Sequence, residues 1–412
     1  SQDAVGKNML TETFTSKEQM EHSSRWIMGI VAMLLMLGIV MVYSAKTVKM
    51  ARLDGDPMAP LTGHAIKVGL GLAGMLLMMR FDYRWLGRHY GKIFLCVVCV
   101  LIMVLIPCFG AEINGARRWF RIAGNMAQPS EFAKLGVIIV VASLIVRAGN
   151  QIQDFNRGLL PALAAVSLIC LLILKEPDFG TAAITGCLAV TLLVIGGVKI
   201  KYFTAMTLFL APLMFIYAYS SMGHVAARIG RFLNRPPGGQ VDMSLMAIAL
   251  GGPSGAGLGA SRMKLNLIPE CESDFIFAII GEELGFIGSA LVLFLFCALL
   301  YHGIKIILGI RNRFGFIMAT GILLLITAQA LVNITVVVGL APTKGLPLPF
   351  ISSGGSSLIA LMMGIGLFLN IARNPDLTSE KIKDKLCEAW FFGLKEKIRP
   401  VRIQTFFSRR AR

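Results

Sequence analysis

The chain has 412 residues, of which 56% are apolar and only 15% are charged, and its formal net charge is +17. This composition and a strongly positive mean hydropathy exclude a set of ordinary soluble domains. Cytoplasmic Lys and Arg residues, together with attraction to anionic lipid headgroups, explain the positive charge, so nucleic-acid binding is not expected.

Apolar runs recur along almost the whole chain, at lengths near the ~20 residues with which a helix crosses ~30 Å of hydrocarbon. Continuous runs such as Ile30 to Val42 lack the period-two alternation of a membrane β-barrel. The sequence therefore predicts an all-α integral membrane protein with about ten transmembrane helices, at about 26–45, 63–79, 90–108, 130–147, 158–174, 180–198, 202–220, 275–300, 314–339 and 355–372.

The distribution of Lys and Arg favours ten spans with both termini in the cytoplasm. We expect a cytoplasmic tail at 1–25, a membrane domain at 26–373 and a basic cytoplasmic tail at 374–412. A large extracytoplasmic loop, about 221–274, is expected between spans seven and eight. The first span is expected to be retained, because a charged stretch without a small-residue cleavage site precedes it.

The outer loops carry more cations than the positive-inside rule allows, which indicates a role for them. Such groups can stabilise a phosphate leaving group. The outer cations are Arg117, Arg118, Arg121, Arg228, Arg231, Arg235, Arg262 and Lys264.

Ionisable residues inside spans are costly and usually face a partner, a cavity or a pathway. Glu131 and Lys134 are spaced i, i+3, so a self-neutralising pair and a substrate role are equally good interpretations. Asp274 begins the eighth span, where a helix N-cap and a reactive carboxylate are both compatible with its position. Glu282 and Glu283 are expected to support the helix.

The spacing of the carboxylates argues for a single base. Eight residues separate Asp274 from Glu282, or ~12 Å along a helix, which exceeds the ~5 to 9.5 Å of glycosidase carboxylate pairs. A hydrolase with both carboxylates on one helix is therefore not expected. A lone Asp274 can instead deprotonate a sugar hydroxyl while the outer cations stabilise a phosphate leaving group.

Seven motifs from about 26 to 373 resemble the SEDS family, named for shape, elongation, division and sporulation. The motifs are N-G-A-R-R-W-F (114–120), Q-P-S-E-F-A-K (128–134), E-P-D-F-G-T-A (176–182), G-L-G-A-S (257–261), P-E-C-E-S-D-F-I-F-A-I-I-G-E-E-L-G (269–285), Q-A-L-V-N (329–333) and P-T-K-G-L-P-L-P-F-I-S-S-G-G-S-S (342–357). The motif at Lys344 is more similar to the division and sporulation members than to the elongation members.

The resemblance implies a peptidoglycan glycosyltransferase that polymerises lipid II on the outer face of the bacterial cytoplasmic (inner) membrane. It also implies undecaprenyl-linked glycan as a substrate, a class B penicillin-binding protein and other division proteins as partners, and a place at the division septum. The sequence departs from the family pattern at Ser353, where an aromatic residue is common, and in a shorter loop near Arg235.

The resemblance implies that Asp274 is the catalytic residue. Expected substrate contacts are Arg117, Arg118, Glu131, Lys134, Arg228, Lys264, Lys344 and Ser352. No dedicated metal cage is evident, but Mg²⁺ or Mn²⁺ bridging Asp274 and a diphosphate is compatible with the sequence. A lipid II flippase and a non-catalytic scaffold for division proteins are the alternatives.

Overall fold

The computed structural model describes residues 2–52, 56, 58–87, 111–113, 116–122, 125–176, 178–204, 223–234, 238–265, 268 and 270–374. The predicted span at 90–108, and the part of the span at 202–220 that follows residue 204, lie outside these residues. The predicted number of ten spans is therefore not tested by the described part of the chain.

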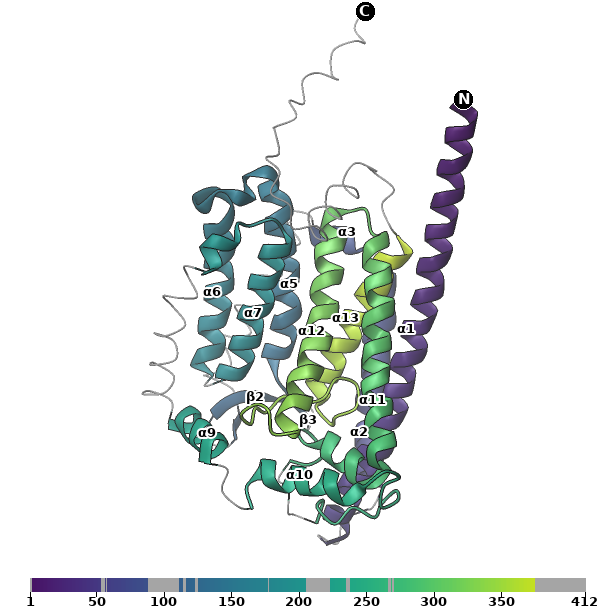
Figure 1. The fold of residues 1–412 in the computed structure, drawn as a ribbon. Helices are drawn as coiled ribbons and strands as arrows, with labels where there is room; N and C mark the ends of the chain where they lie inside the picture. Colours follow the sequence, from purple (N-terminus) through teal and green to yellow (C-terminus); the bar gives the residue numbers. More distant parts are fainter. Residues whose placement is uncertain are drawn as a thin grey trace, which may run out of the picture.

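The described part is a bundle of helices that run roughly parallel to one long axis (Figure 1). Seven helical segments are long and apolar enough to cross a membrane, and the 17-residue helix α7 is a shorter apolar helix beside them. The helices of the bundle are α1 (Gln2–Arg52), α2 (Ala59–Arg80), α5 (Pro129–Ala148), α6 (Leu160–Lys175), α7 (Phe179–Ile195), α11 (Ile276–Gly309), α12 (Arg313–Val337) and α13 (Gly355–Arg373). The prediction of an all-α integral membrane protein is confirmed.

Helix α13 lies in the core of the bundle and is buried along most of its length. It packs tightly against α2, because a Cβ atom at Gly366 would meet the backbone of Met75 and one at Gly71 would meet the side chain of Met362. Small residues allow such close helix packing in membranes, where the hydrophobic effect does not drive helices together.

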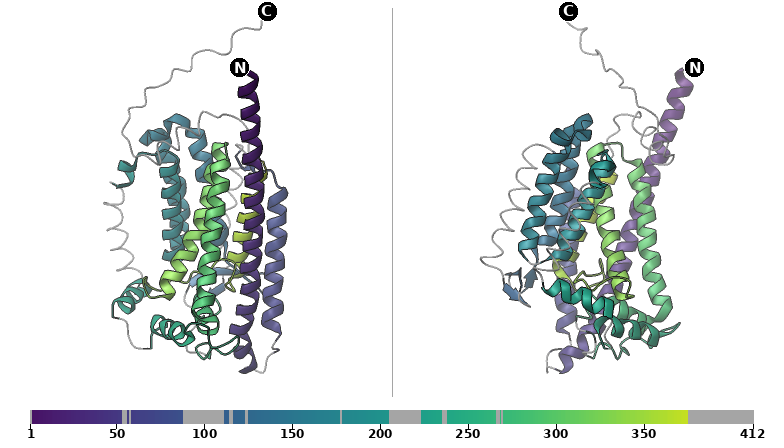
Figure 2. Two further views of the ribbon diagram at one scale, coloured as in Figure 1. Left: turned by 45° about the vertical axis from the view of Figure 1, so that its right-hand side comes forward. Right: turned by 60° about the vertical axis from the view of Figure 1, so that its left-hand side comes forward.

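A cap of shorter elements covers the end of the bundle opposite the N-terminus of α1 (Figures 1 and 2). Three short antiparallel strands follow one another in the order β1-β2-β3. The cap consists of β1 (Ala111–Ile113), β2 (Ala116–Ile122), β3 (Asn125–Ala127), α9 (Gly223–Asn234) and α10 (Gln240–Gly251); the short elements elsewhere are α3 (Tyr83–Gly87), η1 (Gly149–Gln153) and η2 (Phe155–Leu159). The sequence did not predict these strands, nor the two helices inside the predicted 221–274 loop.

Helix α11 is broken at Gly285, whose φ of 67° and ψ of −160° are not helical. The i to i−4 hydrogen bonds across the break are replaced by bonds to the segment after α10. Ala256 N–H donates to the Glu282 carbonyl at 2.9 Å, and Phe286 N–H donates to the Gly252 carbonyl at 2.9 Å. The break therefore leaves these backbone groups paired, as a buried backbone requires.

Candidate active site

Asp274 lies in a turn immediately before α11, at the capped end of the bundle. The N-cap of α11 is Phe275, which makes no side-chain cap hydrogen bond, so the predicted N-cap role of Asp274 is wrong. The Asp274 carboxylate accepts a hydrogen bond from Ser273 Oγ at 2.9 Å. The residue as a whole is half-buried.

Burial raises the pKa of Asp274 from its usual value of 3.8 to about 7. The Ser273 hydrogen bond and the Arg228 guanidinium lower this pKa, whereas the carboxylates of Glu270 and Glu272 raise it. A carboxyl group with a pKa near the working pH is suited to general base catalysis.

The backbone of Asp274 is held by Asn333 of α12. The Asn333 side-chain amide donates to the Asp274 carbonyl at 2.8 Å and to the Leu346 carbonyl at 2.7 Å. It therefore ties Asp274 to the loop that carries Lys344. Gly345 of this loop packs closely against the Asp274 carboxylate, because a Cβ atom there would lie 3.2 Å from Asp274 Oδ2.

Ser352 also connects this loop to Asp274, but through the backbone. Its hydroxyl donates to the Ser273 carbonyl at 2.6 Å and accepts from the Leu348 N–H at 2.8 Å. Ser352 is buried, and its hydroxyl is used in these contacts. This geometry lets Ser352 position the backbone before Asp274, and its substrate contact stays a prediction.

Glu131 and Lys134 form a buried ion pair, with 2.8 Å between Lys134 Nζ and Glu131 Oε2. Only 4% and 1% of the two residues are exposed. Lys134 Nζ also donates to Gln329 Oε1 at 3.3 Å, and the Gln329 amide donates to the Pro347 carbonyl at 3.0 Å. Of the two interpretations of this pair, the geometry favours structural support of the 342–357 loop.

Lys344 lies against the start of α7, where its side chain approaches Gly180. Burial lowers the pKa of Lys344, while Cys187 and Asp178 act in the opposite direction. Asp178 caps α7 by accepting from the Thr181 N–H at 3.0 Å. Lys344 thus packs the 342–357 loop against the N-terminal end of α7.

The structure describes some of the predicted substrate contacts on the capping elements more fully than others. Arg117 and Arg118 belong to β2, but their side chains lie outside the described part of the structure. Arg228 belongs to α9 and is close enough to Asp274 to lower its pKa. Arg228 therefore belongs to the electrostatic surroundings of Asp274, and all three substrate contacts stay predictions.

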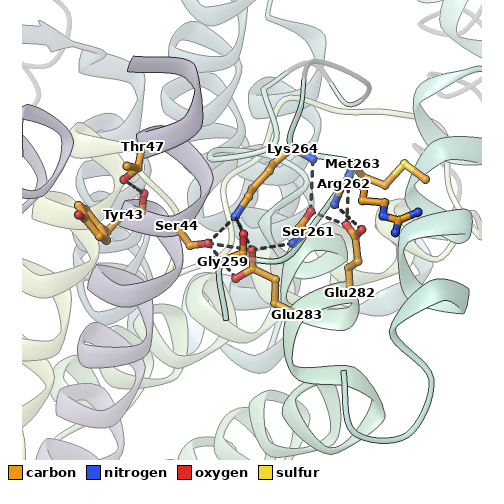
Figure 3. A network of polar contacts seen from close by, with 10 residues as sticks. All are labelled: Tyr43, Ser44, Thr47, Gly259, Ser261, Arg262, Met263, Lys264, Glu282 and Glu283. Carbon is orange, nitrogen blue, oxygen red and sulfur yellow. Dashed lines mark hydrogen bonds and ion pairs between the residues drawn. The ribbon is translucent and has the colours of Figure 1, made fainter. Parts of the chain in front are cut away.

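Lys264 lies in a buried polar network instead of facing outward (Figure 3). Its Nζ pairs with Glu283 Oε1 at 2.8 Å and also donates to Ser44 Oγ of α1 at 3.0 Å. The neighbouring Glu282 accepts from Ser261 Oγ and from the Arg262 N–H. Both glutamates therefore stabilise structure, as expected. Lys264 forms a buried pair with Glu283, and its substrate contact stays a prediction.

Asn333 and Gln329 contact the site but are not among the site residues predicted from the sequence. Both belong to the Q-A-L-V-N motif, and their i, i+4 spacing places them on one face of α12. Neither side chain is charged, so the cost of ionisable groups within spans does not point to them. A pair of amides at helical spacing in an apolar span is a signal that could have identified them.

The described residues contain no group of three or more His, Cys, Asp or Glu side chains that could hold a metal ion. Mg²⁺ usually binds through one or two carboxylates together with substrate phosphates, so a protein-only cage is not required. Asp274 therefore fits a cation shared with a phosphate-bearing substrate.

Comparison with known proteins agrees with the motifs. The family model for FtsW, RodA and SpoVE, described as a cell cycle protein, matches residues 25–376. Stage V sporulation protein E of Bacillus subtilis is 38% identical over 351 residues, which cover 84% of this chain and 95% of the relative. The probable peptidoglycan glycosyltransferase FtsW of Geobacter sulfurreducens is 36% identical over 340 residues, with 81% and 91% covered.

Two solved structures share the fold. A chain described under structural coordination of polymerization and crosslinking by a peptidoglycan synthase complex has a TM-score of 0.70 and 27% identity, and the match covers 85% of this chain and 98% of that chain. The rod shape determining protein RodA of Thermus thermophilus has a TM-score of 0.63 and 26% identity, with 85% and 96% covered. The chain belongs to the FtsW/RodA/SpoVE family of cell cycle proteins, the SEDS family.

Proposed function

We propose that this protein is a peptidoglycan glycosyltransferase that polymerises lipid II on the outer face of the bacterial cytoplasmic membrane during cell division. The observation that carries the proposal is Asp274, a carboxyl group at the capped end of the bundle whose pKa is raised by burial to about 7 and which Arg228 approaches. The names of the relatives and of the similar synthase complex support the same activity.

In the proposed reaction, ionised Asp274 removes the proton from a sugar hydroxyl of the acceptor lipid II. The hydroxyl oxygen attacks the anomeric carbon of the donor glycan, and the bond from that carbon to the diphosphate breaks with inversion. Arg228 and Lys344 stabilise the charge on the departing diphosphate, with Arg117 and Arg118 as further candidates. Undecaprenyl diphosphate leaves, and protonated Asp274 returns the proton to water.

Asn333, Gly345 and Ser352 have a supporting role in this scheme. They hold the backbone on both sides of Asp274 through hydrogen bonds and close packing. Because a general base must lie within hydrogen-bond reach of the proton that it removes, small displacements of Asp274 reduce the rate.

A divalent cation, Mg²⁺ or Mn²⁺, is part of the proposal: Asp274 would hold it, and it would supply positive charge that neutralises the diphosphate. Its test is polymerisation after chelation with EDTA. We expect activity to fall and to return when Mg²⁺ or Mn²⁺ is added back, and activity unchanged by chelation would remove the cation from the scheme.

The proposed setting is a multi-pass protein with both termini in the cytoplasm, located at the division septum. A class B penicillin-binding protein cross-links the glycan strands that this protein makes, and other division proteins join the two. The similar chain from a complex that coordinates polymerization and crosslinking supports the cross-linking partner.

The decisive experiment compares Asp274→Asn with the wild-type protein in liposomes containing lipid II and a purified class B partner. We expect polymerisation to fall by roughly 100-fold or more, the lower end of general base contributions. Asp56→Asn is the matched control, because Asp56 is an exposed carboxylate between α1 and α2. Polymerisation that survives Asp274→Asn unchanged would overturn the role of Asp274.

The same liposomes separate the alternatives. A flippase moves labelled lipid II across the bilayer without forming polymer, and its rate does not require ionised Asp274. A scaffold does neither and still recruits the class B partner.

A further inference from the structure

A cluster of basic side chains lies between α1 and α2, apart from the residues assigned above. His64 and Lys67 are spaced i, i+3 on α2, so they share one face of that helix. Lys46 of α1 acts electrostatically on both of them. We refer to Lys46, His64 and Lys67 as the basic cluster.

The basic cluster has no acidic counterpart among the described residues. The ion pairs found there join Lys134 to Glu131 and Lys264 to Glu283, and neither involves the cluster. The charged groups that act on His64 are the two lysines themselves. Like charges brought together in a partly buried position repel each other, which favours the binding of an anion between them.

His64 is the strongest sign of a ligand. Only 3% of the residue is exposed, and neither ring nitrogen has a hydrogen-bond partner in the described part of the protein. Buried polar groups in native proteins are almost always paired, so an unpaired imidazole calls for a partner. Its ring N–H can donate to an oxygen of an anion held by the lysines.

The N-terminus of α13 adds a further positive pole. A Cβ atom at Gly355 would lie 3.0 Å from Lys67 Cδ, so the Lys67 stem packs against the first residue of α13. The N-cap residue, Gly354, has no side chain with which to cap the first turn of this 19-residue helix. The free N–H groups of a helix N-terminus favour phosphate binding.

The basic cluster lies near the ends of two apolar helices, where a membrane surface is expected. Lys46 is near the end of the apolar stretch Lys17–Thr47, and the other two residues lie in the second and third turns of the apolar stretch Ala59–Arg80. The segment that contains Ser352 and Gly355 connects the cluster to the Asp274 site, since Ser352 binds the Ser273 carbonyl. Phosphate groups of lipids lie at this level of a bilayer.

We propose that Lys46, His64 and Lys67, together with the N-terminus of α13, bind the phosphate group of a membrane lipid. Two sources share this chemistry: a prenyl diphosphate and an anionic phospholipid. The site does not depend on the polymerase activity, because no residue of the basic cluster takes part in the proposed reaction.

The test measures binding to the purified protein in phosphatidylcholine nanodiscs, with the thermal unfolding midpoint as readout. Farnesyl diphosphate is the probe for a prenyl diphosphate, and nanodiscs containing phosphatidylglycerol are the probe for a phospholipid. The variants are the double substitution Lys46→Gln with Lys67→Gln, the conservative Lys67→Arg, and Arg262→Gln as an exposed cation outside the cluster.

We expect an anion to raise the midpoint of the wild-type protein, Lys67→Arg and Arg262→Gln. In the double variant the rise should disappear, with the dissociation constant weakened by roughly tenfold or more. Without an anion, the double variant should unfold at a higher temperature than the wild type, because the repulsion is removed. This increase distinguishes a lost site from a damaged fold.

A response to farnesyl diphosphate alone identifies a prenyl diphosphate as the ligand, and a response to phosphatidylglycerol alone identifies a phospholipid. If neither probe raises the wild-type midpoint, or if the double variant responds like the wild type, the proposal is overturned. Polymerisation is not measured, so this result leaves the proposed function standing.

Discussion

The carboxyl group of Asp274 is surrounded by charges of both signs, and their effects on its pKa differ in direction. Arg228 favours the ionised form, whereas Glu270 favours the protonated form. Since only the ionised form is a base, activity should rise as the pH increases through about 7. Arg228→Gln should therefore move the acid limb of the pH profile to higher pH, and Glu270→Gln should move it to lower pH.

Initial polymerisation rates from pH 5 to 9 measure this limb in each variant. The two substitutions act as controls for each other, because each replaces one charged side chain with the same neutral amide. Movement of both limbs in the same direction would contradict the electrostatic account of Asp274.

Asn333 offers a test of positioning at the residue scale. Asn333→Ala leaves the carbonyls of Asp274 and Leu346 without their shared donor, at a cost of about 1–3 kcal/mol in stability for each buried group. We expect kcat to fall by about tenfold or more while KM changes little, because a displaced base weakens proton removal in the transition state and not the binding of substrate.

Asn370→Ala is the matched control for Asn333→Ala. Asn370 is also a buried amide on a helix of the bundle, and it donates to the Met79 carbonyl at 2.7 Å. It lies far along α13 from the 342–357 loop. We expect comparable destabilisation with kcat retained. Equal loss of kcat in both variants would reduce Asn333 to a general packing role.

At the scale of elements, the polar network of Figure 3 joins α1 to α11 and to the loop before it. Lys264→Met leaves Glu283 as a buried unpaired charge, which costs about 3–5 kcal/mol. The double variant Lys264→Met with Glu283→Leu should recover most of that loss, because it removes both charges.

The unfolding midpoint in mild detergent measures these differences. Arg262→Gln is the control, since it removes an exposed cation from the same loop. A double variant that is no more stable than Lys264→Met would show that the pair is not the source of the stability.

Elements with long apolar runs were predictable, and those without them were not. Helices α12 and α13 correspond closely to the predicted spans at 314–339 and 355–372. The strands β1 to β3 are three to seven residues long, too short for a reliable pattern. The break in α11 is hidden in the sequence, because apolar residues continue on both sides of Gly285 and its hydrogen bonds come from a distant segment.

The candidate site was predictable where charge gave the signal. Asp274 and the Glu131–Lys134 pair were identifiable because charges within or beside apolar spans are costly. The choice between substrate contact and structural support was not, since it depends on partners far away in sequence. Lys264 illustrates this, because its contact with Ser44 spans 220 residues.

At the scale of the whole molecule, the position of the site depends on the orientation of the bundle. The cap lies at the end of the bundle opposite the start of α1, so a cytoplasmic N-terminus places the cap, and with it the Asp274 site, outside. In whole cells, Arg262→Cys should react with a membrane-impermeant maleimide, while Lys17→Cys should react only after permeabilisation. The reverse pattern of labelling would contradict the proposed outer-face reaction.

The break at Gly285 also divides α11 into two parts with different surroundings. The nine residues Ile276 to Leu284 are packed in protein, whereas Phe286, Ile287 and Phe294 beyond the break are exposed. At 1.5 Å per residue, the 24 residues from Phe286 to Gly309 extend about 36 Å, enough to cross a bilayer without the first part. Thicker or thinner bilayers change the tilt of such a span. Because the part next to Asp274 is anchored separately, we expect hydrophobic mismatch to tilt the span while leaving the reactive carboxylate in place.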